Sequence, residues 1–304
     1  MLGAVIRYLA CPYCGDAMVS DGASLRCAAG HTFDIARQGY VSLLPAGASG
    51  GGGDTAAMVQ ARADFLAAGH FASLAAGVAE AASDAAGATD GPGCVADIGA
   101  GTGYYLAAVL DQLPECDGLA LDISKFALRK AARAHPRIGA VACDAWRRLP
   151  VADSAAILAL NVFAPRDGAE LRRILHPAGR LLVVTPAADH LGELIGPLGL
   201  LTVGQQKEER LAGKLSPHFE LASRHEHRVM MSLDHQAIGA AVSMGPSSRH
   251  AETAAFAARI GQLPDSMLVT LAVTLSVFRP VILDDRHRGD GTQNWPSRPN
   301  SACL

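Results

Sequence analysis

The sequence has few aromatic residues, no marked excess of either charge and no long apolar run. Only 5% of its 304 residues are aromatic, and the formal net charge is -3. This balance argues against a general nucleic-acid coat, because non-specific binding depends on many Lys and Arg side chains that neutralise phosphates. A local basic patch is still compatible with it. No apolar run reaches the roughly 18 residues that cross a bilayer, and the start of the chain lacks a signal peptide's apolar core. We therefore expect a cytoplasmic protein with no membrane partner.

Two common nucleotide-binding signatures are also missing. The chain has neither the Gly-x-Gly-x-x-Gly of dinucleotide folds nor the lysine-containing loop that holds a pyrophosphate. Hydrophobic residues make up 50% of the chain and charged residues 18%, which excludes an intrinsically disordered protein. The length allows one large domain and a small one.

Four potential metal ligands stand close together near the N-terminus. They are Cys11, Cys14, Cys27 and His31, with the spacing Cys-x2-Cys-x12-Cys-x3-His. Three thiolates and one imidazole complete a tetrahedral shell, which is the closed arrangement of a structural Zn²⁺ and leaves no position for a catalytic water. The alternative is a set of unliganded thiols in a small hydrophobic cluster, although so short a segment needs a crosslink to fold. The other cysteines lack such spacing.

The stretch Val95–Tyr105 predicts a cofactor cradle. An apolar run ends at Asp97-Ile98, glycines follow at Gly99, Gly101 and Gly103, and an apolar helical pattern comes next. Alternate glycines let the backbone turn tightly and let a ligand approach without meeting a Cβ atom. Asp122 ends the next apolar run, where a carboxylate that binds a ribose is expected in a βαβ unit.

Strands and helices then alternate, which predicts a doubly wound parallel sheet. We expect strands at 118–122, 138–143, 155–160, 181–185 and 269–278, and a helix at 125–134. Two helices, one capped by Asp54 and running from residue 55 to about 69 and one from 71 onward, should pack on the cofactor face. A strand at 40–44 should close the small N-terminal module. The region 187–265 is expected to be helical, with the run 224–228 a charged edge rather than a metal site.

Three sequence blocks occur in one order: the Cys/His motif, the block Gly53–Phe71, and Asp97-Ile-Gly-Ala-Gly-Thr-Gly103 with its two tyrosines. Together they resemble the RlmA family of 23S rRNA guanine-N1 methyltransferases, which includes members that confer tylosin or mycinamicin resistance. The resemblance covers about residues 8 to 280. It implies an α/β fold, namely a Rossmann-like class I S-adenosylmethionine-dependent methyltransferase with a small N-terminal zinc-binding module.

The resemblance also implies the domain organisation and the partner. We expect a zinc-binding RNA-recognition module at 1–46, a linker and helices at 47–90, the methyltransferase domain at 91–283 and a disordered tail at 284–304. The implied substrate is a guanine in a domain II hairpin loop of 23S rRNA, and a role in macrolide resistance stays open. A homodimer is implied as well, although no residue pattern indicates one.

The family's cofactor contacts fall on residues of this chain. The resemblance implies contacts from Gly101 and Thr102, from His190, and from the aromatic residue after Gly69-His70, which is commonly tyrosine and is Phe71 here. The three acids near strand ends would share the rest of S-adenosylmethionine. Asp97 would orient its methionine end, Asp122 would accept hydrogen bonds from the ribose, and Asp144 would hold the adenine amino group unless it is an ordinary loop acid.

The proton acceptor for guanine N1 is not evident from the sequence. Asn161 ends a predicted strand, where catalytic groups of such sheets gather, and could position the guanine, but a neutral amide cannot take its proton. His190 is either that base or a residue that packs on the cofactor. Candidate phosphate contacts are Arg7, Arg26, Arg37, Arg62, Arg147 and Arg148.

Two other functions are compatible with the same motifs. A small-molecule methyltransferase with a zinc appendage would use the same cradle, because the fold does not specify the acceptor. A non-catalytic RNA-binding protein that keeps the cofactor as a structural ligand would bind RNA without methyl transfer.

Overall fold

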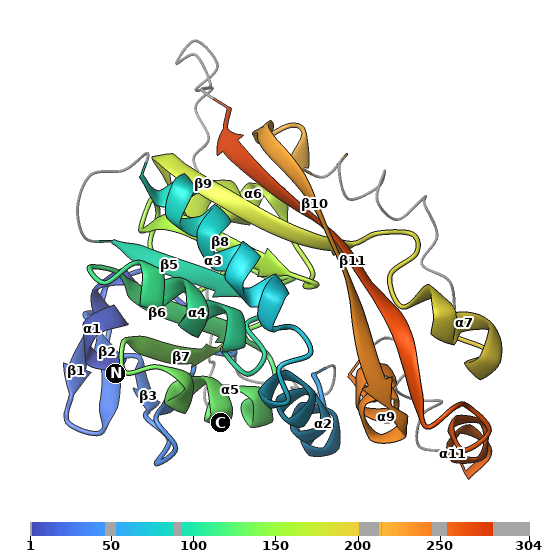
Figure 1. Cartoon of the computed structure of the whole chain (residues 1–304). Coiled ribbons are helices and arrows are strands. Elements are labelled where there is room, and N and C mark those ends of the chain that lie inside the picture. The colour runs from blue at the N-terminus through green and yellow to red at the C-terminus, as the bar shows by residue number, and fades with distance from the viewer. Residues whose placement is uncertain are drawn as a thin grey trace.

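A computed structural model describes residues 2–45, 53–87, 93–200, 213, 215–244 and 254–281. The predicted tail and most of the Gly-rich linker lie outside these residues. The predicted parallel sheet is confirmed: β5 (Cys94–Ile98), β6 (Asp117–Asp122), β7 (Ile138–Ala142), β8 (Ala156–Val162) and β9 (Leu175–Pro186) pair in parallel (Figure 1). The full eight-stranded order is β10-β11-β9-β8-β5-β6-β7-β4.

The order of the parallel strands reverses between β5 and β8. The chain runs from β5 outward through β6 and β7, then returns to the other side of β5 for β8 and β9. At such a switch point the loops leave the sheet in opposite directions and open a crevice at the carboxyl ends of the strands. The glycine turn follows β5 directly, so the fold places it at this crevice.

Two long antiparallel strands complete one edge of the sheet. β10 (Phe219–Asp234) pairs along its length with β11 (Ser266–Pro280), and β11 pairs with β9 only through 273–278. The far half of the ribbon therefore extends past β9 and leads to α9 (His235–Ser243), α11 (Ala254–Ile260) and α7 (Gly192–Leu198). The prediction that 187–265 is helical is wrong for β10, whose side chains are mostly exposed.

Helices cover one face of the sheet. α3 (Ala72–Ala86), α4 (Tyr104–Gln112) and α5 (Lys125–Ala134) share a core with the strands, while α2 (Ala56–Ala67) packs against α9 and α5 beside the crevice. α5 matches its predicted bounds. The Thr55 hydroxyl accepts from the Met58 N–H at 3.2 Å and caps α2, so the expectation that Asp54 caps this helix is wrong by one residue.

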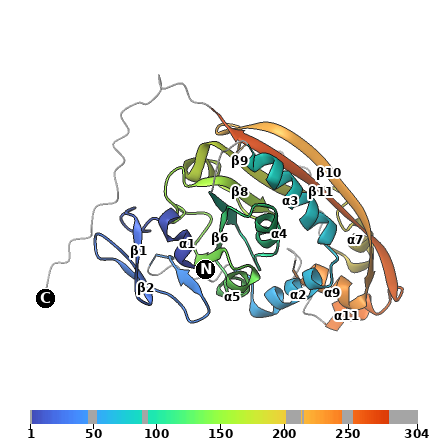
Figure 2. The same ribbon diagram turned by 60° about the vertical axis from the view of Figure 1, so that its left-hand side comes forward.

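The N-terminal elements cover the opposite face (Figure 2). No helix connects β7 to β8 among the described residues, and α1 (Leu2–Val5) with η1 (Ile6–Tyr8) packs over β6 and β7 instead, beside α6 (Gly168–Ile174). β1 (Met18–Asp21), β2 (Ser24–Cys27) and β3 (Thr32–Asp34) form a small separate sheet. β4 (Tyr40–Ser42) exists as predicted, but it extends the large sheet beside β7 rather than closing this small module.

No single helix in the described ranges is long and apolar enough to cross a membrane. α2 and α3 meet that criterion only when they are counted together across a bend of 85°.

Candidate functional site

The glycine turn follows β5 with three left-handed glycines. Gly99, Gly101 and Gly103 have φ angles of +75°, +55° and +77°, which L side chains rarely adopt. A Cβ atom at Gly99 would lie 2.5 Å from Cβ of Ala164, so the turn packs directly against the loop after β8. Thr102 is half-buried between the second and third glycines. Gly103 then precedes α4.

Two carboxylates stand at this turn. Asp97 is 2% exposed at the end of β5, and burial, assisted by the nearby Asp122 carboxylate, raises its pKa to about 8. Asp122 accepts from the N–H of Gly101 at 2.8 Å and from the N–H of Ser124 at 2.7 Å. Burial raises the pKa of Asp122 while these two N–H groups oppose the shift. The turn therefore brings two largely buried carboxyl groups together, and burial disfavours the charged form of both.

Arg62 and Asp54 also belong to this turn, and the sequence pattern did not indicate it. Arg62 on α2 forms an ion pair with Asp54 and donates to the carbonyl of Met244 at 2.9 Å. A Cβ at Gly101 would lie 3.6 Å from its Nη1 atom. Asp54 and the carbonyl of Met244 thus hold Arg62 beside the glycine turn, and its assignment as an RNA phosphate contact stays a prediction. The only sequence feature that pointed to a role for Arg62 was its position in the block Gly53–Phe71, which carries the family resemblance.

Asp144 follows β7 at the same edge of the sheet. Its Oδ1 accepts from the N–H of Trp146 at 2.9 Å, and its Oδ2 lies 3.4 Å from Nε of Arg147. These contacts order the loop after β7. An ordinary loop acid with no role in cofactor binding would make the same contacts. The assignment of Asp144 to the adenine amino group stays a prediction.

An aromatic cluster brings together Phe71 before α3, Phe163 after β8 and His190 after β9. The rings of Phe71 and His190 are 6.3 Å apart, and those of Phe163 and His190 are 5.9 Å apart at 28°. Nδ1 of His190 accepts from the N–H of Ala272 at 3.3 Å, so the neutral ring carries its proton on Nε2. Burial lowers the pKa of His190 to about 4. This ring is a hydrogen-bond donor and a packing surface, and it is a poor base.

Asn161 is fully buried at the end of β8. Its Nδ2 donates to the carbonyl of Pro165 at 2.8 Å, and its Oδ1 has no partner among the described residues. The amide therefore faces inward and braces the loop 161–165. The prediction that Asn161 contacts the guanine directly is not supported by this orientation and stays a prediction.

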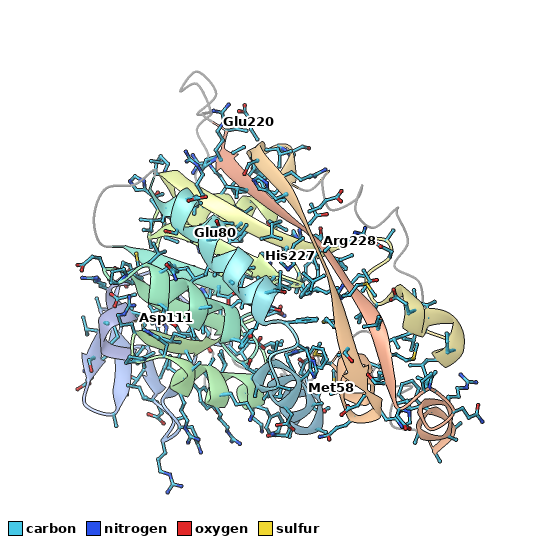
Figure 3. All side chains as sticks on the ribbon, in the orientation of Figure 1. Met58, Glu80, Asp111, Glu220, His227 and Arg228 are labelled. Atoms are coloured by element: carbon cyan, nitrogen blue, oxygen red, sulfur yellow. The ribbon has the colours of Figure 1, made fainter. Side chains whose placement is uncertain are left out.

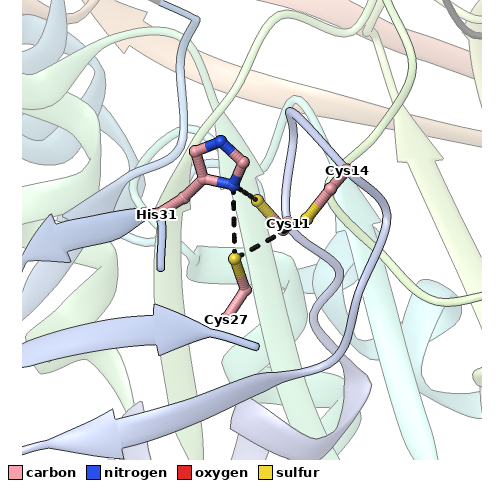
Figure 4. A group of neighbouring side chains, drawn as sticks. All are labelled: Cys11, Cys14, Cys27 and His31. Carbon is pink, nitrogen blue, oxygen red and sulfur yellow. Dashed lines mark hydrogen bonds between the residues drawn. The ribbon is translucent and has the colours of Figure 1, made fainter. Parts of the chain in front are cut away.

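The four predicted metal ligands converge on one point (Figure 4). Sγ of Cys14 lies 3.6 Å from Sγ of Cys27, and Nδ1 of His31 lies 3.5 Å from Sγ of Cys11 and 3.3 Å from Sγ of Cys27. A tetrahedral Zn²⁺ with bonds of about 2.3 Å to sulfur and about 2.0–2.1 Å to nitrogen requires ligand separations near these values. The donor set and its geometry thus fit a closed structural zinc site.

Both the Cys/His cluster and the domain with the glycine turn match known protein families. A family model described as a methyltransferase domain matches residues 95–183, and one described as the RlmA N-terminal zinc ribbon matches residues 9–48. The chain is therefore an S-adenosylmethionine-dependent methyltransferase with an N-terminal zinc ribbon.

Curated relatives narrow this class. The chain is 52% identical to the 23S rRNA (guanine(748)-N(1))-methyltransferase of Streptomyces fradiae, over 91% of this chain and 98% of that one. It is 49% identical to a Micromonospora griseorubida protein described as a putative 23S rRNA (guanine-N(1)-)-methyltransferase, over 91% of this chain and 99% of that one. A Bacillus subtilis protein with the same description is 33% identical over 60% of this chain and 66% of that one. The chain belongs to the family of 23S rRNA guanine-N1 methyltransferases.

Proposed function

We propose that this protein methylates N1 of a guanine in a domain II hairpin loop of 23S rRNA. The proposed target is the guanine equivalent to position 748, for which the Streptomyces fradiae relative is named. The main support is the alignment with this relative, which covers 98% of the relative's length. The alignment therefore includes both the zinc ribbon and the methyltransferase domain of this chain.

The cofactor would lie in the crevice at the glycine turn. When bound, S-adenosylmethionine supplies an electrophilic methyl group, and transfer of this group to guanine N1 releases the N1 proton. Gly101 and Thr102 would line the methionine end and Asp97 would pair with its ammonium group, because the buried carboxylate has no cationic partner of its own among its described contacts. Asp122 would bind the ribose hydroxyls, and Asp144 the adenine amino group.

Apart from uptake of the N1 proton, for which no described residue is assigned, positioning and water exclusion account for the remaining chemistry. The methyl donor is already activated, so alignment of N1 with the methyl group supplies most of the rate enhancement. Phe71 and His190 would supply a ring surface beside the cofactor, and Asn161 holds the loop 161–165 that packs against Gly99. The lowered pKa of His190 and its Nε2–H favour a positioning role for this residue over that of proton acceptor.

The zinc ribbon would serve RNA recognition. Its four ligands leave no position for a reacting group, and the Cys11–His31 cluster lies on the face of the sheet opposite α3 and α4. Single-stranded loops are the part of RNA whose bases proteins can read, and a base in such a loop is extruded at a cost of only a few kcal/mol.

Primer extension across the domain II hairpin tests this proposal. RNA is taken from cells with and without the gene, and N1 methylation stops the primer because it blocks base pairing. We expect a new stop at the guanine equivalent to 748 only in cells with the gene. Equal extension in both strains, with label from the cofactor found in metabolites instead, would overturn the proposal.

Two finer points are checked with the same material. Growth of the two strains on tylosin tests the resistance role that the resemblance implies, and light scattering of the purified protein tests the expected homodimer.

A further inference from the structure

Phe163 has an unusual combination of backbone and exposure. It follows β8 with a φ angle of +54°, in the left-handed region that favours glycine, and it keeps a large apolar side chain there. Its side chain is 42% exposed, which is high for so large a ring. Strained backbone conformations persist only where the surrounding structure holds them, and they cluster at functional sites.

The surroundings of Phe163 hold its ring in one place. The N–H of Phe163 donates to the carbonyl of Val184 at 3.1 Å, and the Asn161 amide braces Pro165 two residues later. Ala164 packs against Gly99, so the loop and the cofactor turn cannot move independently. Phe163 is therefore fixed beside the place where the methyl donor would lie.

The Phe163 ring lies beside His190 on one side, and 42% of the residue is exposed. The neutral His190 ring stacks beside it, 5.9 Å away and tilted by 28°, and the Ala272 N–H fixes the orientation of His190. Phe71 packs on His190 in turn. Part of Phe163 therefore stays accessible to a ligand. This is the arrangement of a stacking platform for a planar ring.

We propose that Phe163 stacks on the target guanine once that base has left the RNA loop, and so holds N1 in line with the methyl donor. This assignment rests on the proposed function. An aromatic side chain that stacks on an unpaired base contributes about 1–3 kcal/mol by alanine substitution, or roughly 5- to 150-fold. Since Phe163 is anchored to the cofactor turn through Ala164, stacking would also align the base.

Substitutions at Phe163 test this role. We expect Phe163→Leu to lower kcat/KM for an RNA hairpin roughly 5- to 150-fold, while Phe163→Trp retains most of it because the stacking surface survives. The dissociation constant for S-adenosylmethionine should stay within about twofold in both variants, since Phe163 is not expected to hold the cofactor.

Phe163→Gly separates stacking from a backbone role. Glycine adopts the left-handed conformation without strain, which offsets part of the lost ring packing and of the added entropy of the unfolded chain, so the variant should stay folded, yet methyl transfer should fall as in Phe163→Leu. Leu221→Ala, which removes an exposed apolar side chain from β10, serves as the matched control and should leave kcat/KM unchanged.

The outcomes separate the two proposals. Wild-type activity on RNA together with Phe163→Leu or Phe163→Gly within about threefold of wild type would overturn the stacking role and leave the proposed function intact. Wild-type protein that methylates no RNA would overturn the proposed function itself.

Discussion

Asp97 is a buried acid whose ionisation is coupled to folding. Its pKa is raised to about 8 in the folded chain, against an ordinary value near 3.9. The folded state therefore binds a proton between about pH 4 and pH 8 that the unfolded state has lost. By linkage, this residue's contribution to stability is complete below pH 4 and is lost as the pH rises through 8.

We predict that Asp97→Asn removes this component of the pH dependence, because the amide imitates the protonated acid. Denaturant unfolding of the cofactor-free protein from pH 5 to pH 9 should show a smaller loss of stability at high pH in the variant than in the wild type. In the wild type, affinity for S-adenosylmethionine should rise from pH 6 to pH 8, as the ammonium group of the ligand favours the carboxylate. Parallel stability curves for the two proteins would contradict the raised pKa.

Individual residues were predictable where their spacing encodes the chemistry. The ligand set Cys11, Cys14, Cys27 and His31 follows from a local pattern, and the structure gathers it as expected. Arg62 was not predictable in the same way, because its partners Asp54 and Met244 lie far apart in sequence and meet only when α2 packs on α9. Arg166 illustrates the same limit: it is 5% exposed, its Nε atom has no hydrogen-bond partner among the described residues, and nothing in its local sequence marks it as buried.

At the scale of elements, α5 carries a basic face. Its sequence holds Lys125, Arg129, Lys130 and Arg133 with no acid, and its opposite face is buried. α5 contacts both β4 and α2, so it lies between the N-terminal segment and the crevice. The chain has a formal net charge of -3, yet four cationic side chains lie on this one ten-residue helix. Such a local concentration of positive charge attracts phosphates.

We predict that the double variant Lys130→Gln/Arg133→Gln weakens RNA binding without affecting the cofactor. Each lost phosphate contact should lower the slope of log Kd against log salt by about 0.7–0.9, because fewer counterions are released on binding. Filter binding between about 50 and 200 mM salt, where such contacts lose much of their affinity, measures this slope. Arg172→Gln/Arg279→Gln, which removes the same charge from α6 and β11, is the matched control. Equal loss of affinity in both double variants would indicate a net-charge effect instead of a role for α5.

Elements differed in how well their patterns predicted them. α5 was predicted to its ends because its apolar positions repeat at helical spacing, Ser124 caps it and Pro136 follows it. β10 was missed because its first half, through residue 228, is largely polar and charged, so the sequence shows no apolar alternation there, although burial alternates between the two faces from His227 to Asp234. Its run 224–228 lies on that strand, where His227 meets Ser73 of α3 and Arg228 pairs with Asp189 (Figure 3). The expectation of a charged edge rather than a metal site is consistent with these contacts.

At the scale of the whole molecule, the N-terminal segment is interleaved with the methyltransferase sheet. The backbone of Tyr8 accepts from Ala152, that of Pro150 accepts from Ala10, and Val5 is fully buried against Gly139. The sequence motifs predicted a zinc-binding module followed by a separate methyltransferase domain. A motif records only order along the chain, so it could not show that the two parts pack into one unit. The pairing of β4 with β7 is a long-range contact that local patterns do not encode.

We predict that Gly139→Ala destabilises the protein by about 1–3 kcal/mol through overpacking. A Cβ at this position would overlap Cγ2 of Val5, so α1 would be displaced from the sheet. Val5→Ala removes that atom, and the double variant should therefore be more stable than the sum of the two single effects predicts. Denaturant unfolding of the wild type, the two single variants and the double variant measures this coupling, and strict additivity would mean that α1 does not pack on β7 in solution.

Zinc removal should destabilise the whole chain rather than one end of it. Cys11 and Cys27 lie in the same apolar cluster as residues of β5, β6 and β8, so loss of the metal would loosen the layer that covers that face of the sheet. Binding free energy at a structural zinc site is folding free energy, and a loss of a few kcal/mol shifts the midpoint by about 2–4 °C per kcal/mol in a chain of this size. We expect Cys27→Ala, or treatment with a strong chelator, to lower a single thermal transition on the order of 10 °C. A second, separate low-temperature transition, with the main one unmoved, would instead mean that the ribbon folds independently of the sheet it covers.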